Sequence, residues 1–339
     1  SNFRSFNVTR NGWSPRDGAG SSAYVENEDP CGSSSGYAVT TSVGLCAATL
    51  GEETDGGIMC PSGYASVVGL KPTVGSTSRA GVIPISHSFD SIGPIGKTVR
   101  DVALVLEAIQ GIDPRDKATL DLDAVRPHNY TQFFMGTKGF KHMLLGVVRR
   151  GIFYNYRYGN IYGNISQEQI DSANDAIKLK YYGAHIHNPA DIESIDEIQQ
   201  GDAEYLVELT EFKQNIANYL SELHHTKLRT LANLIHYNNK HKALEFSEYM
   251  PDQIVFEDAQ NTTGYNSLEY QAALATCLRL GRTQGIDRTL EKYNLDALIM
   301  TGDSAPSAAA IAGYPIMSVP LGYLTENNGI NKTIAGTPY

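Results

Sequence analysis

Residues 30–36 read Pro-Cys-Gly-Ser-Ser-Ser-Gly, and residues 50–61 read Leu-Gly-Glu-Glu-Thr-Asp-Gly-Gly-Ile-Met-Cys-Pro. Between them lies the apolar, small-residue segment 37–50, which predicts a buried helix. Two glycine-rich loops that flank one buried helix bring backbone N–H groups together, because glycine adopts positive φ and allows a ligand to approach closely. The alternative is a pair of ordinary surface turns, and these residues alone leave the two interpretations equally open.

The rest of the chain alternates predicted helices with predicted strands. Thr98 is a candidate N-cap with Asp101 three residues on, so a helix is expected over 98–109, ending at Gly111. A second helix is expected over 166–182. Strands are expected at 144–148, 184–187 and 295–301. Such alternation predicts an α/β sheet covered by helices on both faces.

One further helix is predicted from an apolar stripe. Its members recur at helical spacing: Leu206, Leu209, Phe212, Ile216 and Leu220. The stripe serves either core packing, which we favour, or a lid over a substrate channel.

Composition excludes several classes of protein. The 339 residues are 41% hydrophobic and 19% charged, which is typical of a folded globular chain. The formal net charge is −10, and no basic stripe is present, which argues against nucleic acid and against an anionic membrane surface. No apolar run approaches the roughly 18 residues that a membrane-spanning helix needs.

The four cysteines are Cys31, Cys46, Cys60 and Cys277. They form no pair at zinc-binding spacing, so we expect no metal site. Cys31 and Cys60 belong to the two glycine-rich loops. We favour inert core thiols for this pair, and a disulfide between them stays the alternative.

Five N-x-[ST] sequons are candidate glycosylation sites: Asn7, Asn129, Asn164, Asn261 and Asn331. Chance alone would give roughly three in a chain so rich in Asn, Ser and Thr. The sequons therefore favour a secreted glycoprotein over a cytoplasmic protein only mildly.

The two loops open an ordered series of motifs. After them come Gly-Leu-Lys-Pro-Thr-Val-Gly at 69–75, Ser-Arg-Ala-Gly-Val-Ile-Pro at 78–84, Asp-Ser-Ile-Gly-Pro at 90–94 and Thr-Val-Arg-Asp at 98–101. Asp-Ser-Ala-Pro at 303–306 and Ala-Gly-Tyr-Pro-Ile at 312–316 follow far downstream. This series resembles the amidase-signature enzymes, and most closely their peptide-amidase-like, fungal-type branch.

The resemblance implies one amidase-signature domain over 1–339, with a mixed central β-sheet covered by helices on both faces. It also implies a chain that is incomplete at both ends. The implied activity is hydrolysis of the C–N bond of carboxylic amides, without a cofactor. The implied substrate is a small amide or a peptide amide.

The family mechanism uses a Ser-Ser-Lys triad. A neutral lysine takes a proton from a serine held in a cis peptide, and that serine activates a nucleophilic serine on the second loop. By resemblance, Ser33 falls on the cis-serine, Ser34 on a supporting serine, and position 57 on the nucleophile. The backbone N–H groups of the oxyanion hole fall on four positions: Thr54, Asp55, Gly56 and Gly57.

The chain departs from this pattern twice. The nucleophile position holds Gly57, which has no side chain and cannot form an acyl-enzyme. The family lysine lies further upstream than Ser33 leaves room for, and Lys71 matches a structural position rather than the base. Asp90 and Arg79 are expected to tie the loops around the site instead of doing chemistry.

Two hypotheses follow from these departures. In the first, the chain is an amidase scaffold for amide hydrolysis, seen incompletely and inactive as it stands. In the second, it is a secreted, catalytically silent pseudoamidase that binds a ligand or a protein partner.

Overall fold

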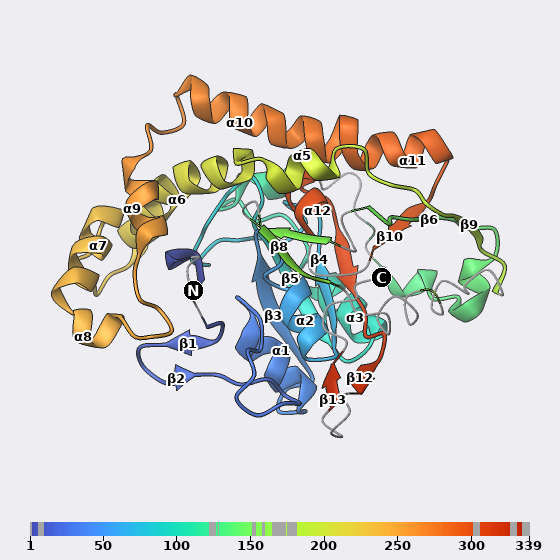
Figure 1. Cartoon of the computed structure of the whole chain (residues 1–339), viewed down its shortest axis with the longest axis horizontal. Coiled ribbons are helices and arrows are strands. Elements are labelled where there is room, and N and C mark those ends of the chain that lie inside the picture. Colours follow the sequence, from blue (N-terminus) through green and yellow to red (C-terminus); the bar gives the residue numbers. More distant parts are fainter. Residues whose placement is uncertain are drawn as a thin grey trace.

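The computed structural model describes residues 2–5, 10–121, 127, 129–150, 154–157, 160–164, 174, 182–300, 306–325 and 331–333. The fold is mixed α/β, with parallel and antiparallel strands and helices packed around them (Figure 1). This confirms the predicted fold class.

The sheet that carries the candidate site has the strand order β11-β4-β5-β3, and all neighbouring strands are antiparallel. The strands are β11 (Ile316–Ser318), β4 (Val68–Lys71), β5 (Ser91–Gly96) and β3 (Ala48–Glu53). In the β3–β5 register Glu52 lies opposite Ile92. The chain leaves the end of β3 directly into the second glycine-rich loop.

Helices cover both faces of this sheet. On one face, α1 (Ser35–Ser42) and α2 (Met59–Tyr64) bury Ala38 and Met59 against Ile95. On the other, Val68 and Leu70 of β4 pack on Val102 and Leu106 of α3 (Val99–Ile109). Both glycine-rich loops adjoin α1 and α2, so the first face supports the site.

A second, parallel sheet has the order β10-β6-β9. Its strands are β10 (Ala297–Ile299), β6 (Leu144–Val147) and β9 (His185–His187). All three lie within the segments predicted as strands, which confirms those predictions.

Long helices form a layer across one side of the molecule, where α6 and α10 lie side by side (Figure 1). The predicted amphipathic helix is α6 (Ala203–Glu222), and Leu209, Phe212, Ile216 and Leu220 of its stripe are buried. They pack with Val255 and Ala259 of α9 (Ile254–Asn261), among others. The stripe therefore serves core packing.

The expected helix over 98–109 is confirmed by α3. Thr98 Oγ1 accepts from the backbone N–H of Asp101, and the Asp101 carboxylate accepts from the backbone N–H of Thr98, which makes a capping box. The expected helix over 166–182 lies almost wholly outside the described residues.

The prediction of one helix over 37–50 is wrong in its second half. Helix α1 ends at Ser42, Gly44 has φ +80°, and residues 48–53 form strand β3. The apolar run looks continuous in sequence, but it covers a helix end, a left-handed glycine and a strand, since pairing with β5 outweighs helix propensity.

The remaining described elements are η1 (Asn2–Arg4), β1 (Trp13–Ser14), β2 (Gly18–Ala19), η2 (Lys117–Thr119), η4 (Thr131–Phe133), η5 (Gly136–Phe140), β7 (Tyr154–Arg157), β8 (Asn160–Asn164), α5 (Ile195–Gln200), α7 (Leu231–Lys240), α8 (Lys242–Glu245), α10 (Leu268–Leu278), the π-helical turn η7 (Arg279–Ile286), α11 (Asp287–Tyr293), α12 (Pro306–Ala312), β12 (Tyr323–Thr325) and β13 (Asn331–Thr333). Within the described part of the chain, no helix combines the length and the apolar character needed to cross a membrane.

Candidate active site

The two glycine-rich loops lie against each other. The backbone N–H of Ser34 donates to Gly57 O at 3.0 Å. The buried Ser34 hydroxyl donates to Glu52 O at 3.1 Å and accepts from the Glu52 N–H at 3.1 Å. The close approach requires a glycine at position 51, because a β-carbon there would lie 2.8 Å from Ser34 Oγ. Of the two interpretations of these loops, the structure therefore supports a built junction over separate surface turns.

Ser33 faces position 57 across this junction. The Gly32–Ser33 peptide bond is cis, and the Ser33 side chain is exposed. A β-carbon built on Gly57 would stand 3.2 Å from Ser33 Oγ. A hydroxyl-bearing side chain at position 57 would therefore start beside the Ser33 hydroxyl.

The backbone around Gly57 leaves no room for that side chain. The same β-carbon would stand 2.5 Å from Glu52 O and 3.2 Å from the α-carbon of Glu53. A contact of 2.5 Å between carbon and a backbone oxygen lies well inside van der Waals distance. The loop as it stands therefore depends on glycine at position 57.

The loop between β3 and α2 presents backbone donors. Gly56 has φ +81°, a conformation that glycine adopts without strain. Among the described residues, the N–H groups of Gly56 and Gly57 find no hydrogen-bond acceptor. Two side-chain contacts hold the loop: Thr54 Oγ1 donates to Asp90 Oδ1 at 2.7 Å, and Ser307 Oγ donates to Asp55 Oδ2 at 2.8 Å.

Glu53 anchors the far end of the loop. It is fully buried, and its Oε2 accepts from the backbone N–H groups of Ile58 and Met59 at 2.7 and 2.8 Å. Burial raises the pKa of Glu53, while Lys71 and these two N–H groups oppose the rise. The carboxylate thus satisfies donors at the start of α2.

Lys71 has no exposed surface. Its Nζ donates to Tyr314 O at 2.9 Å, which ties the end of β4 to the loop before β11. Burial lowers the pKa of Lys71 to about 8, against the opposing effect of Glu53, Asp55 and Asp90. These contacts agree with the structural role expected from its motif.

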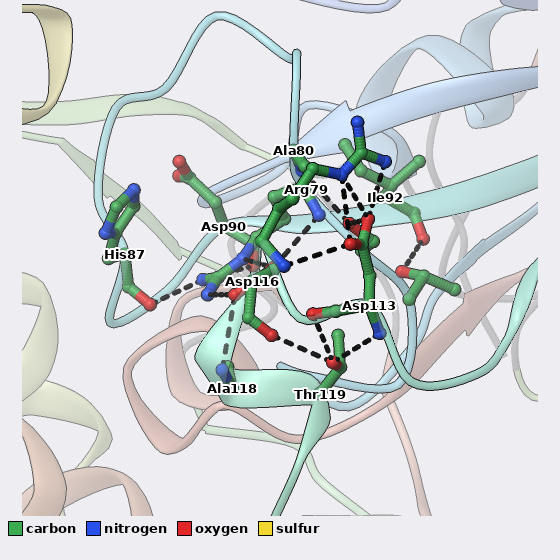
Figure 2. A network of polar contacts seen from close by, with 12 residues as sticks. Arg79, Ala80, His87, Asp90, Ile92, Asp113, Asp116, Ala118 and Thr119 are labelled. Carbon is green, nitrogen blue, oxygen red and sulfur yellow. Dashed lines mark hydrogen bonds and ion pairs between the residues drawn. The ribbon is translucent and has the colours of Figure 1, made fainter. Parts of the chain in front are cut away.

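Arg79 and Asp116 form the centre of a polar network beside the site (Figure 2). Arg79 Nε and Nη2 donate to the two Asp116 carboxylate oxygens, each at 2.8 Å, and both side chains are about nine-tenths buried. Arg79 Nη1 also donates to the carbonyl oxygens of His87 and Asp90. Asp90 in turn holds Thr54, so Arg79 and Asp90 tie loops together, as predicted.

A disulfide joins Cys31 and Cys60, with their α-carbons 5.8 Å apart. The expectation of inert thiols at these positions is wrong, because the approach of the two loops brings the cysteines within bonding reach. Cys46 is exposed and Cys277 is buried, and both are free thiols. The disulfide links the segment before Ser33 to the segment after Gly57.

Glu211 of α6 lies near the site, because Ser86 contacts both Glu211 and Asp90, and the sequence prediction did not include it. Glu204, Glu208 and Glu211 follow each other at helical spacing on α6, but only the apolar stripe of that helix was considered. The i, i+4, i+7 pattern could have identified them.

Of the five sequons, Asn129 and Asn261 are exposed. Asn7 and the side chains of Asn164 and Asn331 lie outside the described residues. Over the described part of the chain, no three acidic, histidine or cysteine side chains converge as a metal site would require.

The family model named Amidase matches residues 1–334. The chain belongs to the amidase family. A probable amidase of Arabidopsis thaliana is 38% identical over 327 residues, which cover 95% of this chain and 59% of that protein. A putative amidase of Arthroderma benhamiae is 32% identical over 338 residues. The match covers 97% of this amidase-family chain and 54% of the Arthroderma protein.

Solved structures agree with this assignment. The native peptide amidase of Stenotrophomonas maltophilia has a TM-score of 0.83 at 35% identity, covering 96% of this chain and 65% of that one. A peptide amidase in complex with the competitive inhibitor chymostatin has a TM-score of 0.84 at 34% identity. The match covers 99% of this chain and 67% of that one. This amidase-family chain thus spans a little over half the length of the curated relatives it matches.

Proposed function

We propose that this amidase-family chain binds small carboxylic amides or peptide amides where loops 32–36 and 52–57 meet, and that it does not hydrolyse them. The observation that carries the proposal is Gly57. It stands beside Ser33 at the expected nucleophile position, in a backbone that has no space for a β-carbon.

The proposed loss of turnover has a chemical reason. Without a side chain at position 57, no acyl-enzyme forms, and loss of a triad nucleophile typically costs on the order of 10⁶ in rate.

The proposed binding rests on backbone N–H donors, which a glycine at position 57 does not remove. The N–H groups of Gly56 and Gly57 find no acceptor among the described residues, and such donors suit an amide carbonyl or a carboxylate. The likeness to a peptide amidase that holds a competitive inhibitor supports a peptide amide as the ligand.

The test measures binding and ammonia release on the same material. Isothermal titration with a panel of N-acetylated amino-acid amides should give saturable heats with the full chain, while an ammonia assay stays at background. Ammonia release above background would contradict the loss of turnover, and the absence of any saturable heat would contradict the binding.

Amide hydrolysis is the second candidate, favoured by the position of Ser33 Oγ beside residue 57. It requires serine at position 57 and an upstream segment with a lysine. Protein extended by such a segment and carrying Gly57→Ser should release ammonia from simple amides. If no amide of a panel gives ammonia above background, this candidate is eliminated.

We also propose that the protein passes through the secretory pathway. The Cys31–Cys60 disulfide suits an oxidising compartment, and two sequons, Asn129 and Asn261, are exposed. Protein from a eukaryotic secretory host should lose mass on treatment with peptide N-glycosidase. Material from the native source without glycan and with free Cys31 would contradict this location.

A further inference from the structure

The loop that carries the candidate N–H donors begins where the pairing of β3 with β5 ends. Glu53 and Ser91 are the last residues of the two strands that face each other in the register. Thr54 and Asp90 are the next residues on either side, and the Thr54 hydroxyl donates to Asp90 Oδ1 at 2.7 Å. A side-chain hydrogen bond therefore continues the connection between the two strands one residue beyond the backbone pairing.

Asp90 is a fixed acceptor for this hydroxyl. Its Oδ2 accepts from the N–H of Ile85 at 2.9 Å, and its Oδ1 accepts from the N–H of Ser86 at 3.0 Å. Its carbonyl oxygen also accepts from Arg79 Nη1 at 3.4 Å. The carboxylate of Asp90 is therefore held in place by contacts that do not involve Thr54.

The Thr54 hydroxyl has one hydrogen and two carboxylates near it. Asp90 Oδ1 lies at 2.7 Å and Glu52 Oε1 at 3.4 Å, so the hydrogen is directed at Asp90. Burial raises the pKa of Asp90 to about 6, against the opposing effect of its hydrogen-bond donors and of Arg79, so Asp90 is ionised at pH 8. Thr54 and Asp90 are both buried, and a hydrogen bond to an ionised acceptor away from water is stronger than one between neutral groups.

The far end of the loop is held separately. Glu53 Oε2 accepts from the N–H groups of Ile58 and Met59. Between the two ends lie Gly56 and Gly57, whose N–H groups find no acceptor within the described part of the chain. Glycine has no side chain that fixes its backbone, so the direction of these two N–H groups depends on the anchors at both ends of the loop.

Another side-chain anchor of the loop lies at the surface. Ser307 Oγ donates to Asp55 Oδ2 at 2.8 Å, in an exposed contact. Water competes for both partners of an exposed hydrogen bond, which lowers its net contribution. The buried contact from Thr54 to Asp90 is therefore the one that we expect to control the start of the loop.

We propose that Thr54 is a positioning residue, which through its hydrogen bond to Asp90 directs the N–H groups of Gly56 and Gly57 at the carbonyl oxygen of the amide ligand. The inference rests on the proposed function and adds to it a side chain that controls affinity through the loop backbone. Two N–H groups bind one carbonyl oxygen only when both point at it, since hydrogen bonds weaken steeply as they bend. Loss of the Thr54 hydroxyl therefore weakens amide binding in a chain that stays folded.

The test measures the affinity of the full chain and its variants for Nα-acetyl-phenylalaninamide by isothermal titration at pH 8. Thr54→Val removes the hydroxyl at nearly constant volume and should weaken binding about tenfold, as for the loss of a hydrogen bond to a charged group. Thr54→Ser keeps the hydroxyl and should bind within about twofold of the unaltered chain. The matched control is Thr49→Val on the same strand, which loses a hydroxyl that donates to Tyr37 O at 3.0 Å and should keep the affinity unchanged.

Loss of fold and misdirected donors give different results in these titrations. A fraction of irreversibly unfolded chain lowers the number of binding sites per chain, whereas misdirected N–H groups raise the dissociation constant at full stoichiometry. Thermal unfolding of each variant confirms that it is folded at the temperature of the titration. Thr54→Ala removes the same hydroxyl and gives the same comparison if the valine variant does not fold.

The outcomes separate this inference from the proposed function. Unchanged affinity in folded Thr54→Val or Thr54→Ala overturns the inference and leaves amide binding intact. An equal loss of affinity in Thr54→Ser, or in Thr49→Val, also overturns it, because the hydroxyl of Thr54 is then not the cause. Absence of binding by the unaltered chain overturns both the inference and the proposed function.

Discussion

The hydroxyl of Ser33 lies 3.2 Å from the point where a β-carbon on Gly57 would stand. The two residues belong to different loops, and the contact between Ser34 N and Gly57 O holds these loops together. Ser33 and position 57 are therefore neighbours across the junction of the two loops.

Gly57→Ala should lower the free energy of unfolding by about 1–3 kcal/mol, because the new β-carbon overlaps Glu52 O and forces the loop to shift. Gly57→Ser should lower the free energy of unfolding less than Gly57→Ala does, since the new hydroxyl lies next to Ser33 Oγ and can hydrogen-bond to it. Urea unfolding of both variants measures the difference. In the Ser33→Ala background the advantage of serine over alanine at position 57 should vanish, and its persistence would show that Ser33 does not contact the new hydroxyl.

Removing the disulfide by Cys31→Ser with Cys60→Ser should cost about 3–4 kcal/mol of unfolding free energy, from the chain entropy of a loop that spans 29 residues. Cys46→Ser is the control, because Cys46 is an exposed free thiol and its removal should leave the unfolding midpoint unchanged. An equal midpoint for the double variant and the unaltered chain would mean that Cys31 and Cys60 are not linked in solution.

Lys71 should make the protein more stable as pH rises through the alkaline range. Its folded pKa is about 8 against 10.5 for the ordinary side chain, so the unfolded state binds more protons between these values. The stability lost by burying the charged amine is therefore regained between pH 8 and 10.5, on the order of 3 kcal/mol.

The comparison for this pH dependence is Lys71→Met, which keeps the aliphatic length without the amine. The difference in unfolding free energy between the unaltered chain and this variant should shift in favour of lysine from pH 8 to 10.5. A difference that stays flat over that interval would show that Lys71 titrates at its ordinary pKa.

Asp116→Asn should destabilise the fold by about 3–5 kcal/mol, because it leaves the buried guanidinium of Arg79 without its charge partner. Thermal and urea unfolding measure the loss. The matched control is Arg115→Ala, which breaks an ion pair whose arginine is exposed and should move the unfolding midpoint very little. Similar midpoint changes for both variants would contradict the central role of Arg79 and Asp116.

Local signals in the sequence were sufficient for several elements. The capping box of Thr98 and Asp101 marked the start of α3, and the apolar stripe from Leu206 to Leu220 marked α6. These features involve neighbours within one or two turns, so the chain carries them before any long-range packing occurs. The segment 37–50 was misjudged because strand pairing with β5 decides its second half.

By itself, the sequence determined the family, through motifs that keep their order along almost the whole chain, and the absence of a serine at position 57. Only the tertiary structure decided which partners meet: Ser33 with Gly57, Cys31 with Cys60, Arg79 with Asp116, and Glu211 of α6 with Ser86 and Ser88. The physical reason is that these contacts join residues far apart in the chain. Their distances are set by how sheet and helices pack, and no local propensity encodes that packing.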